Sequence, residues 1–236
     1  MDTLTQLHRN GFAVAPGVVS NATVDRSIAA TAEADSDPGV RAKAGRLYAV
    51  RNLMSLVPEV GALAQSAETR SVVEPVLGES AFPVRAILFD KLDGANWKVA
   101  WHQDLSIAVR RRIDVDGFGP WSVKAGVQHV QPPVNILEGM LTVRVHQDDC
   151  DADNGPLQVL PGSHACGALS PGAVSGWRER VTPVACHVPA GGAVLMRPLL
   201  LHASSASTVP KHRRVIHIEY AAAKLPGGLE WAEERP

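Results

Sequence analysis

The spacing of apolar residues changes about a third of the way along the chain. Before residue 80, two segments carry apolar side chains at helical spacings and predict helices, Ala22 to Ala34 with Asn21 as N-cap, and Val60 to Leu77. After residue 80, short runs rich in Val, Ile and Leu alternate with clusters of Gly, Pro, Asn and Asp, as is typical of strands joined by turns. The predicted strands are Val84 to Phe89, Leu141 to Val145, Leu157 to Leu160, Ala193 to Met196, Leu199 to His202 and Val215 to Tyr220.

The order of these elements predicts the fold class. Helices followed by many short strands favour a mainly β core with helices packed against one side. Residues 106–139 are expected to form a long irregular connection, because Asp116 to Pro120 and Pro132-Pro133 interrupt any regular pattern. Long connections of this kind often line or cover a site. With 236 residues, the chain is expected to form one domain, 1–236, with 106–139 as an active-site loop.

Composition excludes several classes of function. The 23 basic and 24 acidic side chains give a net charge of −1, which offers no basic field for a nucleic acid. No apolar run is long enough to span a membrane, and Met1 to Gln6 lacks the pattern of a signal peptide, so we expect a cytoplasmic protein. The three cysteines form no CxxC pair, which argues against a disulfide framework and a thiolate zinc site.

Candidate chemistry begins at Trp101-His102-Gln103-Asp104. On a strand, residues i and i+2 share a face, so His102 and Asp104 would point the same way. Two histidines and one carboxylate form the facial triad that binds non-haem Fe(II) and leaves coordination positions open. His202 is the candidate third ligand, because it ends an apolar run that is an unusual setting for a surface histidine.

A second pair with the same spacing, His146 and Asp148, stays open at this point. It lies on a predicted strand whose odd-numbered positions are apolar and whose even-numbered positions are polar, so one face is buried and the other faces water or an internal cavity. The spacing alone does not choose between the two pairs. Arg144 lies on the polar face, where an unpaired charge is costly, so it is expected to pair with a substrate carboxylate or with a protein carboxylate such as Glu219.

The strand after His202 supplies a candidate anchor for a second ligand. Arg213 shares a face with His217, whereas Arg214 shares the other face with Ile216 and is expected at the edge of the core. The planar guanidinium of Arg213 would suit a carboxylate. Further substrate contacts are expected in the connection 106–139, and the candidates there are Trp121, Lys124 and His129.

Taken together, these motifs resemble the phytanoyl-CoA dioxygenase family of Fe(II)- and 2-oxoglutarate-dependent oxygenases. The stretches that carry the resemblance are Asn10 to Ser20, Trp101 to Leu105, Asp153 to His164, Arg197 to His202 and Arg213 to Ile216. The resemblance implies a double-stranded β-helix, also called a jelly roll or cupin-like fold. It also selects the first of the two HxD pairs, because the family does not take its carboxylate from the strand that precedes the Asn154-Gly155-Pro156-Leu157 stretch.

The resemblance implies a complete active site. His102, Asp104 and His202 would bind Fe(II), while Arg213 and Ser204 would bind the distal carboxylate of 2-oxoglutarate, with O₂ as second co-substrate. The retained Asp104 favours hydroxylation of a small-molecule metabolite, because related halogenases replace this carboxylate with a small residue. The alternatives are desaturation, epimerisation or cyclisation at the same site, or a non-catalytic jelly-roll binding protein. A zinc hydrolase ranks lower, because no glutamate stands at HExxH-type spacing.

Overall fold

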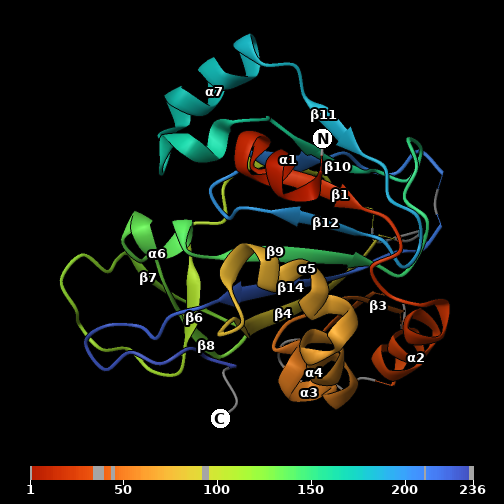
Figure 1. The fold of residues 1–236 in the computed structure, drawn as a ribbon, viewed down its shortest axis with the longest axis horizontal. Coiled ribbons are helices and arrows are strands. Elements are labelled where there is room, and N and C mark those ends of the chain that lie inside the picture. The colour runs from red at the N-terminus through yellow and green to blue at the C-terminus, as the bar shows by residue number, and fades with distance from the viewer. Residues whose placement is uncertain (1, 34–39, 44–45, 92–95, 210, 234–236) are drawn as a thin grey trace.

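A computed structural model of the chain describes residues 2–33, 40–43, 46–91, 96–209 and 211–233. Its largest sheet has seven antiparallel strands, and β14, the last strand in sequence, lies in the middle between β9 and β4 (Figure 1). In spatial order the strands are β1 (Phe12–Ala15), β12 (Ala193–Met196), β9 (Leu141–His146), β14 (Arg213–Ala221), β4 (Phe82–Lys91), β3 (Arg46–Val50) and β2 (Val40–Lys43).

Two smaller antiparallel sheets complete the β structure. The four-stranded sheet contains β11 (Val184–Cys186), β10 (Leu157–Val159), β13 (His202–Ser204) and β5 (Val99–His102). The three-stranded sheet contains β6 (Ile107–Val109), β8 (Val127–Val130) and β7 (Trp121–Lys124). Side chains from the seven-stranded and four-stranded sheets line a common cavity between them, so the two sheets face one another. The fold is therefore the jelly roll that the family resemblance implied.

Helices cover the other face of the large sheet (Figure 1). The face of β9 and β14 that carries Val143 and Ile218 packs against Leu63 and Val73 from the helices, and this cluster is the largest apolar core. The helices are α1 (Thr3–Asn10), α2 (Asn21–Ala32), α3 (Leu53–Leu56), α4 (Pro58–Gln65), α5 (Ala67–Leu77), α6 (Val134–Glu138) and α7 (Pro171–Arg180), with a 3₁₀ turn at Ser163–Cys166. Because the helices bury one face, the opposite face is free to line the cavity.

Three local predictions need correction. The N-cap of α2 is Ser20 rather than Asn21, since the Ser20 hydroxyl accepts a hydrogen bond from the Thr23 amide. The helix expected over Val60 to Leu77 is two helices, because Ser66 is extended and its hydroxyl caps α5. The strand expected over Leu199 to His202 begins only at His202, since the preceding residues form a turn closed by the Leu200 amide and the Arg197 carbonyl.

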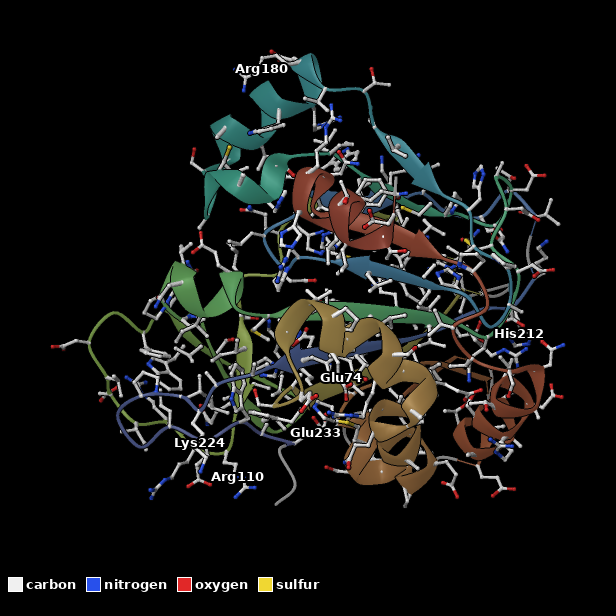
Figure 2. All side chains as sticks on the ribbon, in the orientation of Figure 1. Glu74, Arg110, Arg180, His212, Lys224 and Glu233 are labelled. Carbon is white, nitrogen blue, oxygen red and sulfur yellow. The ribbon has the colours of Figure 1, made fainter. Side chains whose placement is uncertain are left out.

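The expectation of an irregular connection over 106–139 is also wrong. This stretch contains β6, β7, β8 and α6, and it builds a second apolar core with the C-terminal segment. Trp231 is 2% exposed and forms an isolated bridge with Val109. The Glu233 carboxylate accepts hydrogen bonds from the amides of Ala86 and Ser55, which ties this segment to β4 and α3 (Figure 2). Within the described residues, none of the helices has the length and apolar character needed to cross a membrane.

Candidate metal centre

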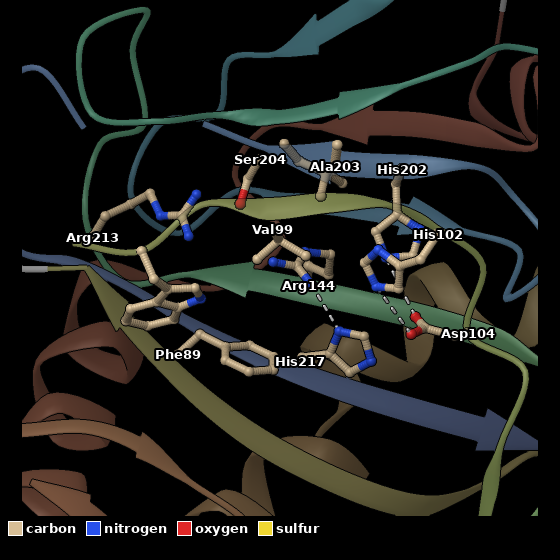
Figure 3. Close-up of a pocket in the computed structure, with 12 residues that line it drawn as sticks. Phe89, Val99, His102, Asp104, Arg144, His202, Ala203, Ser204, Arg213 and His217 are labelled. Atoms are coloured by element: carbon tan, nitrogen blue, oxygen red, sulfur yellow. Dashed lines mark hydrogen bonds and ion pairs between the residues drawn. The ribbon is translucent and has the colours of Figure 1, made fainter. Parts of the chain in front are cut away.

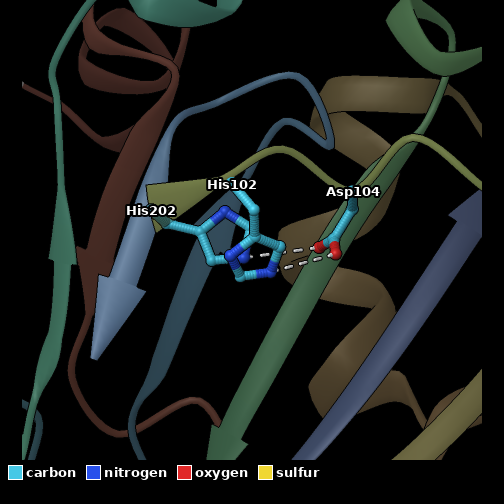
Figure 4. Close-up of side chains that lie close together, drawn as sticks. All are labelled: His102, Asp104 and His202. Atoms are coloured by element: carbon cyan, nitrogen blue, oxygen red, sulfur yellow. Dashed lines mark ion pairs between the residues drawn. The ribbon is translucent and has the colours of Figure 1, made fainter. Parts of the chain in front are cut away.

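Three side chains from two neighbouring strands converge at one end of the cavity (Figure 4). His102 ends β5 and His202 begins β13, and the two residues are direct partners across the antiparallel pair. Asp104 lies just beyond β5 rather than on it, where its amide donates to the Pro198 carbonyl at 2.9 Å. One nitrogen or oxygen from each of the three side chains lies within 4.8 Å of the other two.

The hydrogen bonds behind the two imidazoles set their tautomers. His102 Nδ1 lies 2.8 Å from the Ala100 carbonyl, and His202 Nδ1 lies 2.9 Å from the Leu200 carbonyl. A carbonyl only accepts, so each Nδ1 carries the proton and each Nε2 presents a lone pair. The Asp104 carboxylate faces these lone pairs, with Oδ1 3.8 Å from His102 Nε2 and Oδ2 3.6 Å from His202 Nε2.

The protonation states also suit a metal. Burial lowers the pKa of His202 to about 4, so this ligand is neutral at pH 7. Burial alone would raise the pKa of Asp104, but His202, His217 and His102 hold it below its usual range. Asp104 Oδ2 is buried and has no hydrogen-bond partner among the described residues. Three acceptor atoms that face one another without a proton between them need a cation, so this donor set fits Fe(II) or a similar divalent ion.

The opposite end of the cavity holds buried positive charge (Figure 3). Arg213 is 3% exposed, and its guanidinium donates to the Gly155 carbonyl. Lys91 is 0% exposed, and its ammonium donates to Ser204 Oγ at 3.1 Å and to the Ser205 carbonyl. Burial and the charge of Arg213 lower the pKa of Lys91 to about 7. Two adjacent cations whose described hydrogen-bond acceptors are neutral carbonyl, hydroxyl and thiol groups form a site for an anion.

The backbone at Gly155 explains one motif of the sequence. Gly155 has φ of +68°, and a Cβ there would lie 2.5 Å from the Ser205 carbonyl and 3.1 Å from Lys91 Nζ. Asn154 is fully buried and holds this turn through the Asp149 carbonyl and the Asp151 amide. The Asn154-Gly155 pair therefore brings β10 close to Ser204 and Lys91 at the anion site.

The structure distinguishes the two HxD pairs, and it also distinguishes Arg213 from Arg214. Arg214 lies outside the cavity and forms a bidentate pair with Asp148, at 2.9 and 2.6 Å. Asp148 is therefore engaged away from His146, whose ring is buried on β9 and has no hydrogen-bond partner among the described residues. The second HxD pair does not converge on a metal site, whereas Arg213 points into the cavity.

Arg144 lines the same cavity, but the protein partner described for it is not the expected Glu219; pairing with a substrate carboxylate stays a prediction. Its Nη1 lies 2.8 Å from His217 Nδ1, and its Nε has no partner among the described residues (Figure 3). Glu219, the expected protein carboxylate, pairs with Arg85 instead. Burial lowers the pKa of Arg144 to about 10, so the guanidinium remains charged at neutral pH.

The three remaining candidates lie on the three-stranded sheet, and the residues lining the metal cavity in the described chain do not include them. Trp121 packs beneath the guanidinium of Arg112. Lys124 Nζ donates to Ser106 Oγ at 3.0 Å, two residues beyond Asp104. His129 is 3% exposed, and its Nδ1 lies 3.0 Å from the Val127 carbonyl.

Lys91 and Arg85 are functional candidates that the sequence interpretation missed. Both follow the alternation of β4, whose pocket-facing positions also include Ile87 and Phe89. The sequence contains a signal for both residues, because each is a cation that shares one strand face with the apolar residues Ile87 and Phe89.

A jelly roll with a His-Asp-His group between its sheets defines the class of non-haem metal enzymes with open coordination positions. The sequence profile of the phytanoyl-CoA dioxygenase family matches residues 7–215. The chain therefore belongs to this family of Fe(II)- and 2-oxoglutarate-dependent oxygenases, as the motifs indicated.

The individual relatives and solved structures described next share less than 30% sequence identity with this chain. L-proline trans-4-hydroxylase from Streptomyces griseoviridis is 29% identical over 154 residues, which are 54% of this chain and 49% of that protein, so the match spans about half of the relative. The structure of EctD from S. alaskensis with 2-oxoglutarate and 5-hydroxyectoine has a TM-score of 0.72 at 20% identity, covering 98% of this chain and 80% of EctD. The α-ketoglutarate-dependent carbocyclase SnoK from nogalamycin biosynthesis has a TM-score of 0.70 at 17% identity, covering 94% of this chain and 83% of SnoK.

Proposed function

We propose that the protein hydroxylates an unactivated C–H bond of a small-molecule metabolite, using Fe(II), 2-oxoglutarate and O₂. The observation that carries the proposal is the pairing of two sites in one cavity, the His-Asp-His group at one end and the buried Arg213 at the other, with the buried Lys91 bound to Ser204 beside it. A dicarboxylic acid with a metal-chelating 2-oxo group fits this pairing. Family membership and the ligand sets named for related structures support it.

Each residue has a defined task in this proposal. His102, Asp104 and His202 hold the metal on one side and leave the cavity side open. Arg213, Lys91 and Ser204 bind the distal carboxylate and so orient the co-substrate along the cavity. When bound, Fe(II) and 2-oxoglutarate supply the oxidising chemistry, in which O₂ is consumed and succinate and CO₂ are released with the hydroxylated product. The buried walls exclude water from the reacting groups.

A second outcome at the same site is cyclisation, desaturation or epimerisation, and the fold shared with the carbocyclase SnoK favours keeping it. The same residues would bind metal and co-substrate in either case. Product analysis separates the outcomes, because hydroxylation adds one oxygen atom to the substrate whereas the others do not.

The first experiment is an anaerobic titration of the apo-protein with Fe(II) and 2-oxoglutarate, followed by visible absorption. We expect a weak charge-transfer band that requires both components and is absent in His102→Ala. In Arg213→Met the apparent Kd for 2-oxoglutarate should rise about 100-fold, because a buried charge partner of the carboxylate is removed. Arg214→Met is the matched control and should bind normally, since Arg214 pairs with Asp148 outside the cavity. Fe(II) binding without a band would contradict the co-substrate assignment and favour a hydrolase, and absence of metal binding would favour a non-catalytic binding protein.

A further inference from the structure

The large sheet presents its cavity-facing side chains in rows that run across β4, β14 and β9. Residues in one row are register partners, so their side chains are neighbours on the same face. From the Arg213 end onward, the rows are Lys91 with Arg213; Phe89, Val215 and His146; Ile87, His217 and Arg144; and finally Arg85, Glu219 and Thr142.

The last row lies beyond the reach of the co-substrate. Arg213 and Glu219 are six residues apart on β14, a separation of about 20 Å at the usual rise of a strand. His217, which lines the cavity together with the metal ligands, lies between them. A five-carbon diacid held by Arg213 at one end and by the metal at the other is far too short to reach Arg85 or Thr142. These side chains are therefore positioned to face the prime substrate.

Two cationic side chains lie beyond His217, next to the residues that line the cavity. Arg85 is 8% exposed on β4, and Lys124 approaches from β7 with its ammonium bound to Ser106, close to Asp104. Burial, together with the positive charges of Arg85, Lys124 and Arg51, lowers the pKa of His129 to about 4. His129 is therefore neutral at pH 7 and adds no charge of its own. Burial and the charges of Arg85 and Arg51 likewise lower the pKa of Lys124.

Three carboxylates act on Arg85, and each already has a partner; Glu233 accepts hydrogen bonds from the amides of Ala86 and Ser55. Glu219 pairs with Arg85 and also lies 3.2 Å from His217 Nε2, while Asp104 belongs to the metal group. Lys124 makes no ion pair with a described residue, and its printed hydrogen-bond partner is a neutral hydroxyl. Arg85 Nε and Thr142 Oγ1 are buried donors that lack a hydrogen-bond partner in the described chain. Buried donors without partners, next to a lysine that makes no ion pair with a described residue, fit an oxyanion.

We propose that the prime substrate is an anion whose carboxylate or similar oxyanion lies between Arg85 and Lys124, beyond His217 on the side away from Arg213. The inference rests on the proposed function, because it takes the Arg213 end as the co-substrate site. It adds a substrate class to that function, namely small metabolites that carry a carboxylate on the far side of the C–H bond that is oxidised.

The test measures thermal stabilisation of the protein loaded with Ni(II) and saturated with 2-oxoglutarate, so that the Arg213 end is already filled. The probes are sodium acetate and neutral acetamide, at equal sodium chloride. For a site with a Kd of about 10 mM, about 100 mM acetate should raise Tm by about 3–5 °C, and acetamide should not. Lys124→Met and Arg85→Gln should lose this response. The exposed Lys224→Met is the matched control and should keep it.

Two results would overturn the inference. Equal effects of acetate and acetamide would show that the site does not select an anion, and an unchanged acetate response in folded Lys124→Met would place the anion elsewhere. Failure of the proposed function is recognised separately, because it would appear as loss of 2-oxoglutarate binding in the wild-type protein. If Arg85→Gln does not fold, Lys124→Met alone decides, since Lys124 lies on an edge strand and makes one described hydrogen bond.

Discussion

Lys91 should make 2-oxoglutarate binding depend on pH. Its ammonium is fully buried beside Arg213, and its pKa of about 7 means that half of the unliganded molecules carry a neutral amine at that pH. A carboxylate bound beside Ser204 would favour the charged form, so binding takes up a proton whenever the free protein is deprotonated. The affinity for 2-oxoglutarate is therefore expected to be highest well below pH 7, where Lys91 is protonated, and to fall as pH rises through and above 7.

The size of the effect follows from the fraction of protonated Lys91. Between about pH 6.5 and about pH 8.5, a group with a pKa of about 7 falls from about three quarters protonated to about 3%, so the Kd for 2-oxoglutarate should rise about 25-fold. The other groups that act on Lys91 keep their charge over this range, because the pKa of Arg144 is about 10 and burial raises the pKa of Cys150 above its usual 9.0.

The assay is calorimetric titration of the Ni(II)-loaded protein with 2-oxoglutarate at several pH values, in two buffers that differ in ionisation enthalpy. Wild-type protein should show both the rise in Kd and proton uptake, and Lys91→Met should show neither while binding more weakly at low pH. Lys91→Met should also unfold at a higher temperature without ligand, because it removes a buried charge repelled by Arg213. A pH slope that persists in Lys91→Met would refute the reasoning.

Two further predictions concern residues that support the site. Gln103→Leu removes hydrogen bonds to the carbonyls of Gly167 and Leu199 and from the amide of Leu169, at 2.8, 2.6 and 2.8 Å, so it should cost about 3 kcal/mol of unfolding free energy and weaken Ni(II) binding in a calorimetric titration. An unchanged urea midpoint would contradict this. Trp231→Ala should cost about 3–5 kcal/mol in urea unfolding, because a 2% exposed indole is lost from the core around β6. A loss below 1 kcal/mol, about the size of a surface substitution, would mean that the C-terminal segment does not hold β6 in place.

The sequence predicted those parts of the site that depend on local alternation. His102 and His202 come from short strands next to apolar runs, and Arg213 differs from Arg214 only in the face of the strand that it occupies. The choice of Arg213 over Arg214 follows from the two-residue period of side chains along a strand. Asp104 was predicted on the assumption that it shares a strand face with His102; the strand ends at His102, and Asp104 nevertheless lies at the same cavity.

The rest depends on long-range register. Lys91 faces Arg213 only because β4 and β14 pair in one register, and sequence spacing does not reveal that pairing. The strands β7 and β8 were missed because they are short and half-exposed, so their alternation is weak. Ser66 was taken as part of one helix because the apolar spacing continues past it, although its side chain caps a new helix.

The central place of β14 in the large sheet has a consequence for how the protein is made. Both β4 and β9 hydrogen-bond to β14, so during synthesis each leaves the ribosome with this edge open and must wait for residues 213–221 before the sheet can close; the other edge of β9 also waits, for β12. Until then, two apolar strands have unpaired edges, which is the condition under which nascent β proteins aggregate or recruit chaperones. The mean sequence separation of the paired strands is large, so folding is expected to be slow for a chain of this length. Arg213 begins the same strand, so its guanidinium reaches the cavity only in the step that closes the sheet.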